Sequence, residues 1–140
     1  MPGFQPISGF TADGGGLPAG SRQLLVVTAA DWSATRGQLQ CFVRGAEFDA
    51  WQPDGLPVPV SLGRSGLAWG RGLHPAAAHP RRKQEGDGCA PAGVFVIGPL
   101  FGEADELARL PGVRMPFLSI QPSLKAVDDP ASAHYNRIVD

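Results

Sequence analysis

Apolar and polar positions alternate with a period of two over several short stretches, which is the pattern of β-strands. The first stretch, 24–27, is a continuous run of Leu and Val, as expected of a strand buried on both faces. In the next, 38–44, Leu39, Cys41 and Val43 alternate mainly with polar residues, which indicates a half-buried strand paired with the first. The two stretches predict the beginning of an antiparallel meander.

Further strands are expected along the rest of the chain. Phe48 and Trp51 recur on a third segment, which the turn residues Pro53-Asp54-Gly55 predict to end there. Residues 58–62 alternate again, but Pro59 cannot donate a hydrogen bond to a sheet ladder and favours an edge position. Three more apolar runs predict an interior strand at 94–97 and further strands at 117–120 and 125–127.

Only one segment, 102–110, has the features of a helix. Acidic residues occupy its first turn, Arg109 lies in its last turn, and Pro111 ends it. Residues 74–88 are rich in Pro and charge without an apolar face, which predicts a long surface loop. The pattern as a whole predicts a mainly β fold with one short helix.

Composition adds an expected domain organisation. The 140 residues include 19 Gly and 14 Pro, which indicates many turns, while 43% apolar and 18% charged residues are typical of a folded chain. A chain of this length can bury one core but not two. Six glycines and three prolines among the first 21 residues predict a flexible leader over 1–21, followed by one domain over 22–140.

Charge and hydropathy exclude several classes of partner. The formal net charge of -1 implies no bulk attraction to nucleic acid or anionic lipid, so neither is expected as a partner. The longest charge-free apolar stretch, 90–102, is too short and too interrupted by Gly and Pro to span a bilayer. The first 21 residues lack the basic and apolar regions of a secretory signal. Two cysteines permit one disulfide and do not fix the compartment.

Several residue types used in catalytic and metal sites occur without their usual spacing. Cys89 with His74 or His79 has the groups of a nucleophile and base, or of a zinc site. However, Cys89 follows Gly-Asp-Gly and precedes Ala-Pro, which is a turn leading into extended backbone, and nothing in the spacing directs either His toward it. We therefore expect no metal and no cofactor, and we do not favour a Cys89-dependent enzyme. Cys41 is interpreted as a small core residue.

The basic residues suggest a ligand with carboxylates. The stretch 63–72 lacks the Gly-Lys-Ser/Thr ending of a phosphate loop, so its glycines are interpreted as serving tight backbone geometry. Arg64 and Arg71 within it are candidates to meet carboxylates of a ligand. The run Arg81-Arg82-Lys83 is interpreted as a solvated surface, and Asp128-Asp129-Pro130 as a turn.

Three blocks of the chain form a recognisable series. They are GRSGLAWGRG (63–72), EGDGCAPAGVF (85–95) and VDDPASAHYNRIVD (127–140). In this order they resemble the catalytic domain of the L,D-transpeptidases, the YkuD/ErfK family, and the resemblance covers about Gln23 to Asp140. The second block is the most telling, because family members carry Gly-Asp-Gly, a basic residue, and then Thr/Ala-Pro-x-Gly-x-Phe. Here Cys89 stands at the basic position, so it does not correspond to the family's nucleophile.

The resemblance implies an L,D-transpeptidase-like β-sandwich or mixed sheet that acts on peptidoglycan stem peptides in the periplasm or cell envelope. In this family a Cys thiolate attacks a stem-peptide amide, a His transfers protons, and an amine of a second stem resolves the thioester into a cell-wall cross-link. The candidate substrate-binding residues in the first two blocks are Arg64, Trp69, Arg71 and Asp87.

The 140 residues lack the His and the Ser/Thr-x-Gly-Cys element that follow the third block in the family. We therefore expect the N-terminal part of such a domain, incomplete at its C-terminus because of truncation or degeneration, with no catalytic residue and no turnover of its own. The alternative is a non-catalytic β-domain that binds a cell-wall peptide or a protein partner through its Arg-bearing loops. An incomplete sheet also predicts self-association through an uncovered edge.

Overall fold

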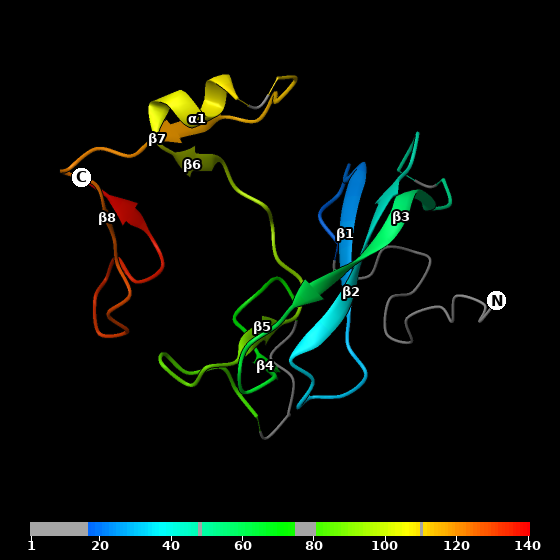
Figure 1. Ribbon diagram of the computed structural model, residues 1–140, viewed down its shortest axis with the longest axis horizontal. Helices are drawn as coiled ribbons and strands as arrows, with labels where there is room; N and C mark the ends of the chain where they lie inside the picture. The colour runs from blue at the N-terminus through cyan, green and yellow to red at the C-terminus, as the bar shows by residue number, and fades with distance from the viewer. Residues whose placement is uncertain (1–16, 48, 75–80, 110) are drawn as a thin grey trace. The chain divides into compact units, whose positions relative to one another are not determined.

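The computed structural model describes residues 17–47, 49–74, 81–109 and 111–140 (Figure 1). The described residues form nine short strands and one helix, so the predicted mainly β fold class is confirmed. By its internal contacts the chain divides into two compact units, Met1–Phe95 and Val96–Asp140. The prediction of a single domain over 22–140 stays a prediction. The predicted leader, 1–21, falls largely outside the described residues.

A three-stranded antiparallel sheet dominates the first unit. Its strands are β1 (Gln23–Thr28), β2 (Arg36–Val43) and β3 (Gln52–Ser61), in the order β1-β2-β3. The predicted pairing of the first two strands is confirmed, with Leu24 opposite Phe42. The edge position predicted from Pro59 is confirmed as well, because β2 is the one strand among the described residues that pairs with β3.

Strand β1 differs from the prediction of a strand buried on both faces. Leu24 and Val26 are half-buried, whereas Leu25 and Val27 on the opposite face are each 47% exposed. One face of β1 is thus partly covered, while the other leaves nearly half of each of its apolar side chains exposed. The Leu/Val run therefore identified the strand correctly but not its burial.

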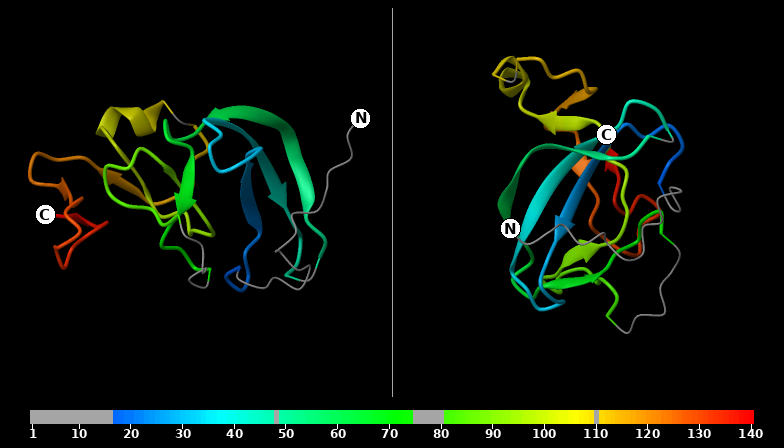
Figure 2. Two further views of the ribbon diagram at one scale, coloured as in Figure 1. Left: turned by 90° about the horizontal axis from the view of Figure 1, so that it is seen from below. Right: turned by 90° about the vertical axis from the view of Figure 1, so that its right-hand side faces the viewer.

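The turn predicted at Pro53-Asp54-Gly55 is wrong, because these residues lie inside β3. The strand continues through them with a shift of register opposite Leu39 and Cys41, where Gly55 takes a positive φ of 75°. A bulge of this kind bends a strand without ending it, and β3 visibly bends along its length (Figure 2). Phe48, from the predicted third segment, lies outside the described residues.

Two short strands complete the regular structure of the first unit. Strand β4 (Leu67–Trp69) pairs in parallel with β5 (Ala90–Ala92). The interior strand predicted at 94–97 is wrong, because β5 ends at Ala92 and Phe95, Val96 and Ile97 are exposed. An apolar run forms a strand only where its backbone can pair with a second segment. Here β4 pairs with residues 90–92 and not with 94–97.

The second unit contains the remaining elements. Strands β6 (Leu100–Gly102) and β7 (Phe117–Ser119) are parallel, and β8 (Lys125–Ala126) pairs antiparallel with β9 (Ile138–Val139). The strands predicted near 117–120 and 125–127 are therefore confirmed. The segment predicted to be helical contains α1 (Ala104–Ala108).

Helix α1 is stabilised at its ends by its own charged side chains. The carboxylate of Glu106 accepts the Glu103 N–H at 2.9 Å, and Asp105 pairs with Arg109 at 2.8 Å, four residues apart. No helix that the structure describes is long and apolar enough to cross a membrane.

The buried core is small. Among the described residues, only Phe42 and Ala68 are buried apolar side chains, while many large apolar side chains keep more than a third of their surface exposed. Backbone pairing therefore contributes more to holding these elements together than side-chain burial does.

Candidate ligand-binding site

The first two blocks of the resemblance form one hydrogen-bonded structure, which we name the Gly-rich block and define as residues 63–74 and 81–95. Strands β4 and β5 form its centre, with Leu67 opposite Ala90. Backbone bonds extend the contact on both sides of the strands. They join Ser65 N–H to Gly88 at 3.0 Å, Ala90 N–H to Gly66 at 2.9 Å, Gly70 N–H to Ala92 at 2.9 Å, and Leu73 N–H to Val94 at 2.8 Å.

Close backbone approach explains two glycines of the first stretch of this block. At Gly66, where φ is +81°, an added Cβ would lie 2.2 Å from the carbonyl oxygen of Trp32. At Gly63 it would lie 2.3 Å from the backbone nitrogen of Ala90. No side chain fits in either place, so the structure confirms that these glycines serve tight backbone geometry.

The turn before β5 is organised around the carboxylate of Asp87. This carboxylate accepts the Gln84 and Cys89 backbone N–H groups, each at 2.8 Å, and the Lys83 ammonium at 2.6 Å. The Gln84 N–H, the Lys83 ammonium and the Cys89 N–H together lower the pKa of Asp87 to about 2. The same ion pair raises the pKa of Lys83. These three donors thus hold the Asp87 carboxylate ionised and in place. The interpretation of Asp87 as a substrate-binding residue stays a prediction.

The basic run Arg81-Arg82-Lys83 is not a uniformly solvated surface as predicted. Residue Arg82 forms a β-bridge with Trp69, so its neighbours on either side point the other way. Arg82 is exposed, whereas Arg81 and Lys83 are half-buried. The guanidinium of Arg81 donates to the carbonyl of Trp32 at 3.1 Å and to the carbonyl of Ser65, and it lies 3.4 Å from Sγ of Cys89.

Cys89 and His74 have different neighbours. Sγ of Cys89 lies between the Arg81 guanidinium and the Ser65 carbonyl, the latter at 3.5 Å. Nδ1 of His74 instead accepts the Val94 N–H at 3.1 Å. The structure therefore gives no support to a nucleophile and base formed by this pair.

The described residues show neither a disulfide nor a metal-binding group of these side chains. His79 lies outside the described residues. Both Cys41 and Cys89 are free thiols. Among the residues that the structure describes, no three His, Cys, Asp or Glu side chains are grouped to hold a metal ion.

Trp69 lies in a row of rings. Its ring centroid is 5.4 Å from that of Trp32 and 5.0 Å from that of His74, whose ring in turn meets Phe95 edge-on at 6.1 Å. Trp69 is half-buried and Phe95 is 45% exposed, so one end of the row faces solvent. Sequence reasoning missed Trp32 and His74 as members of this row. The available signal was a large aromatic residue, Trp32, within a polar turn.

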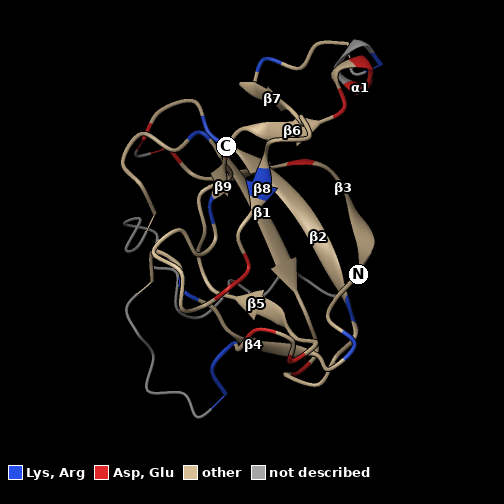
Figure 3. Cartoon of the chain, turned by 90° about the vertical axis from the view of Figure 1, so that its left-hand side faces the viewer, with Lys and Arg blue, Asp and Glu red and all other residues tan. Residues whose placement is uncertain are grey.

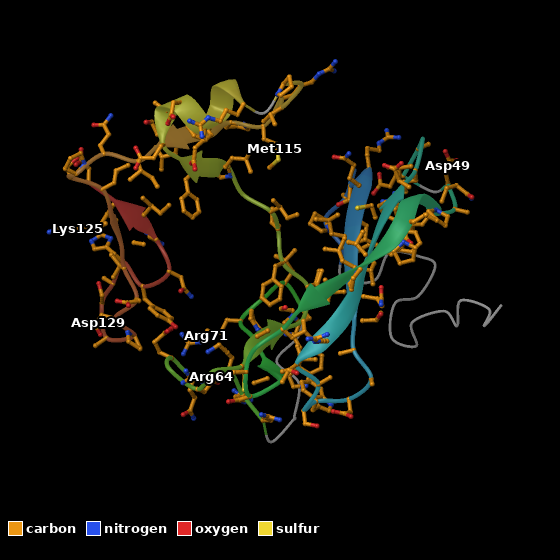
Figure 4. The ribbon with its side chains drawn as sticks, viewed as in Figure 1. Asp49, Arg64, Arg71, Met115, Lys125 and Asp129 are labelled. Atoms are coloured by element: carbon orange, nitrogen blue, oxygen red, sulfur yellow. The ribbon has the colours of Figure 1, made fainter. Side chains whose placement is uncertain are left out.

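Arg64 and Arg71 lie on the loops that flank β4, and both are exposed (Figure 4). The Arg64 side chain passes over Gly88, where an added Cβ would lie 2.8 Å from its Nε atom. Among the described residues, the Arg64 guanidinium has no hydrogen-bond or ion-pair partner, which leaves its donors available to a ligand.

Positive charge is concentrated in the Gly-rich block. It contains five cationic side chains and only two carboxylates, Glu85 and Asp87, in a chain whose net charge is -1. The basic segment beside β4 is visible in Figure 3. This surface favours a ligand that carries carboxylates. The five cations are Arg64, Arg71, Arg81, Arg82 and Lys83.

The third block of the resemblance belongs to the second unit. Its ends form the β8–β9 hairpin region, where Val127 N–H donates to Arg137 and Asn136 N–H donates to Val127, each at 2.9 Å. The carboxylate of Asp129 accepts the Ala131 N–H at 2.9 Å, as expected of the turn predicted at Asp128-Asp129-Pro130.

The residues of the Gly-rich block thus combine a rigid backbone, a row of rings and exposed guanidinium groups. Comparison of the chain with protein-family models, with curated proteins and with solved structures finds no match.

Proposed function

We propose that this chain is an L,D-transpeptidase-like domain that binds peptidoglycan stem peptide through the Gly-rich block. One observation carries the proposal: the first two blocks of the resemblance, 63–72 and 85–95, lie side by side as β4 and β5 with their flanking turns. A family-specific binding surface built from both blocks requires such contact.

The side chains of the block suit a peptide with carboxylates. The Arg64 guanidinium offers planar donors to a carboxylate, and Arg71 presents a second cation beyond the other end of β4. Trp69 and Phe95 give a ring surface for apolar parts of the ligand. Asp87 contributes indirectly, because it holds the turn over which Arg64 lies.

The proposed role of these 140 residues is binding without acyl transfer. The family's Ser/Thr-x-Gly-Cys element does not occur in them. Cys89 is held against Arg81 and Ser65, while the ring of His74 lies against Trp69. A thiolate nucleophile needs a base within hydrogen-bond reach, and these contacts provide none.

Binding is tested by titrating the isotope-labelled chain with a synthetic stem tetrapeptide and following its amide resonances. We expect shifts confined to 63–74 and 81–95. Arg64→Ala and Arg71→Ala should each weaken binding about tenfold, as expected for one lost charge-assisted contact. Arg114→Ala, which removes an exposed arginine of the second unit, is the matched control and should bind like the parent chain.

Two results would contradict the proposal. The first is unchanged affinity in both arginine variants of the block. The second is no binding of the tetrapeptide at all, which would favour the alternative of a non-catalytic β-domain whose Arg-bearing loops bind a protein partner.

Catalysis is tested separately by incubating the chain with tetrapeptide-bearing muropeptides and searching for cross-linked products or a thioester by mass spectrometry. We expect neither, and Cys89→Ser should give the same result. A product that disappears in Cys89→Ser would show that the assignment of Cys89 as a non-catalytic residue is wrong.

A further inference from the structure

The outer edge of β1 carries backbone groups that can pair with another strand. The Arg44 N–H donates to the Arg22 carbonyl at 3.0 Å, which sets the phase of the antiparallel ladder with β2. Residues at alternate positions then direct their N–H and C=O groups away from β2. These are Gln23, Leu25 and Val27, and no partner for their outward backbone groups is present among the described residues.

The two edges of the sheet differ in how they resist further pairing. Strand β3, at one edge, contains three prolines and a bulge, which remove donors and bend the strand. Strand β1, at the other edge, has the sequence QLLVVT, with no charge, proline or glycine and a regular register to β2. Such an edge is a template for an added strand.

We infer that β1 is a dimerisation edge, on which a second copy of this chain places its own β1 antiparallel. A two-fold axis brings the same strand from each copy into one ladder, so a single self-complementary edge suffices. The three-stranded sheets of the two copies then continue into one sheet across the axis. The inference does not depend on the proposed function.

Charge at the ends of β1 favours a second copy and an antiparallel arrangement. Arg22 comes directly before the strand, and Asp31 lies three residues after its last residue, Thr28. Antiparallel pairing brings Arg22 of each copy toward the Asp31 end of the other, whereas parallel pairing would place like charges together. Arg22 is exposed and has no ion-pair partner among the described residues. Asp31 carries a negative charge at neutral pH, as an aspartate ordinarily does, and hydrogen bonds from the Ser33 hydroxyl and backbone N–H lower its pKa further.

The exposed apolar side chains of β1 supply the apolar part of this interface. They are Leu25 and Val27, each 47% exposed on the same face of the strand. Val58 lies on that face too, opposite Leu39, but it belongs to β3, two strands away from the proposed dimerisation edge. If the axis passes beside Leu25, this residue lies opposite its copy, and the two apolar faces join across the new strand pair.

The test is the mass of the chain in solution, measured by sedimentation over a wide concentration range. We expect a dimer that dissociates on dilution. Leu25→Lys places two like charges near the axis and should weaken dimerisation at least about tenfold. Leu25→Pro should do the same, because it removes an outward N–H that makes no bond to β2. Val58→Lys, on the same face but at the proline-bearing edge, is the matched control and should dimerise like the parent chain.

Circular dichroism of each variant shows whether the sheet has formed. The inference is wrong if the parent chain is a monomer at every concentration, or if folded Leu25→Lys and Leu25→Pro dimerise unchanged. A monomer in which the Leu25 and Val27 amides exchange slowly with solvent would show that another segment of the same chain, or a bound peptide, covers this edge instead.

Discussion

The three-stranded sheet and the Gly-rich block lie in the same unit but are stabilised in different ways. The sheet has strands of up to 10 residues, held by backbone ladders, and one buried side chain, Phe42. The Gly-rich block has strands of three residues, and it depends on side-chain hydrogen bonds and on glycines without room for a Cβ. We therefore expect the sheet to tolerate most surface substitutions, while the block is sensitive at a few defined residues.

The connection between β1 and β2 joins the two regions. The carbonyl of Trp32 accepts the Leu67 N–H at 2.8 Å and the Arg81 guanidinium at 3.1 Å. The Trp32 ring also contacts Trp69. Because Trp32 accepts hydrogen bonds from β4 and from Arg81 and its ring contacts Trp69, changes that displace Trp32 should affect the block more than the sheet.

The largest effect is expected from Gly66→Ala. The new Cβ would overlap the Trp32 carbonyl, and alanine is strained at a φ of +81°, so we expect unfolding free energy to fall by about 4 kcal/mol. Gly86→Ala is the matched control, since its φ is +74° and nothing lies within 4 Å of the new Cβ. It should cost only about 1 kcal/mol. Equal losses in urea denaturation would mean that close approach is unimportant here.

Phe42→Ala tests the sheet. Phe42 is 7% exposed, and removing its ring should lower the unfolding free energy by about 3 kcal/mol. Phe101→Ala is the control, because Phe101 is 62% exposed and should lose little. Amide exchange should accelerate in β1 and β2 of Phe42→Ala before it does in β4 and β5. The reverse order would contradict the distinction between the two regions.

Arg81→Met is expected to weaken the block without affecting the sheet. It leaves the carbonyls of Trp32 and Ser65 without their guanidinium donor, at a cost of about 2 kcal/mol. The adjacent Arg82→Met should change stability by less than about 0.5 kcal/mol, because Arg82 is exposed. Both are measured by chemical denaturation, and a similar loss in the two variants would show that the run acts only through its net charge.

The smallest effect is a pH dependence of the turn at Asp87. Its pKa is lowered to about 2 by the Gln84 N–H, Lys83 and the Cys89 N–H, so ionisation stabilises the folded turn above the unfolded pKa of about 4. That stabilisation should be lost as the pH falls from about 4 through about 2. The carboxyl resonance of Asp87 measures the titration directly, and Asp87→Asn should remove this pH dependence. A midpoint near 4 in the folded chain would contradict the hydrogen-bonded turn.

Local features of the chain were predictable because their causes lie within a few residues. The Leu/Val run and the alternation after it predicted β1 and β2, and the acidic start with Pro111 at the end predicted the helical segment. The edge position of β3 followed from the missing N–H of Pro59. The glycines of 63–72 indicated tight backbone geometry, which the structure confirms.

Tertiary structure decided the features that depend on a distant neighbour. The same apolar character leaves Leu25 half exposed and Phe95 outside any strand, because burial and pairing require a second segment alongside. Arg81 is engaged and Arg82 exposed only because the bridge to Trp69 sets which way each points. The sequence by itself determined the mainly β character, the strands β1 and β2, the edge position of β3 and the positively charged block. Contacts between residues far apart in the chain determined which of those residues meet, since such contacts leave no periodic pattern in either segment alone.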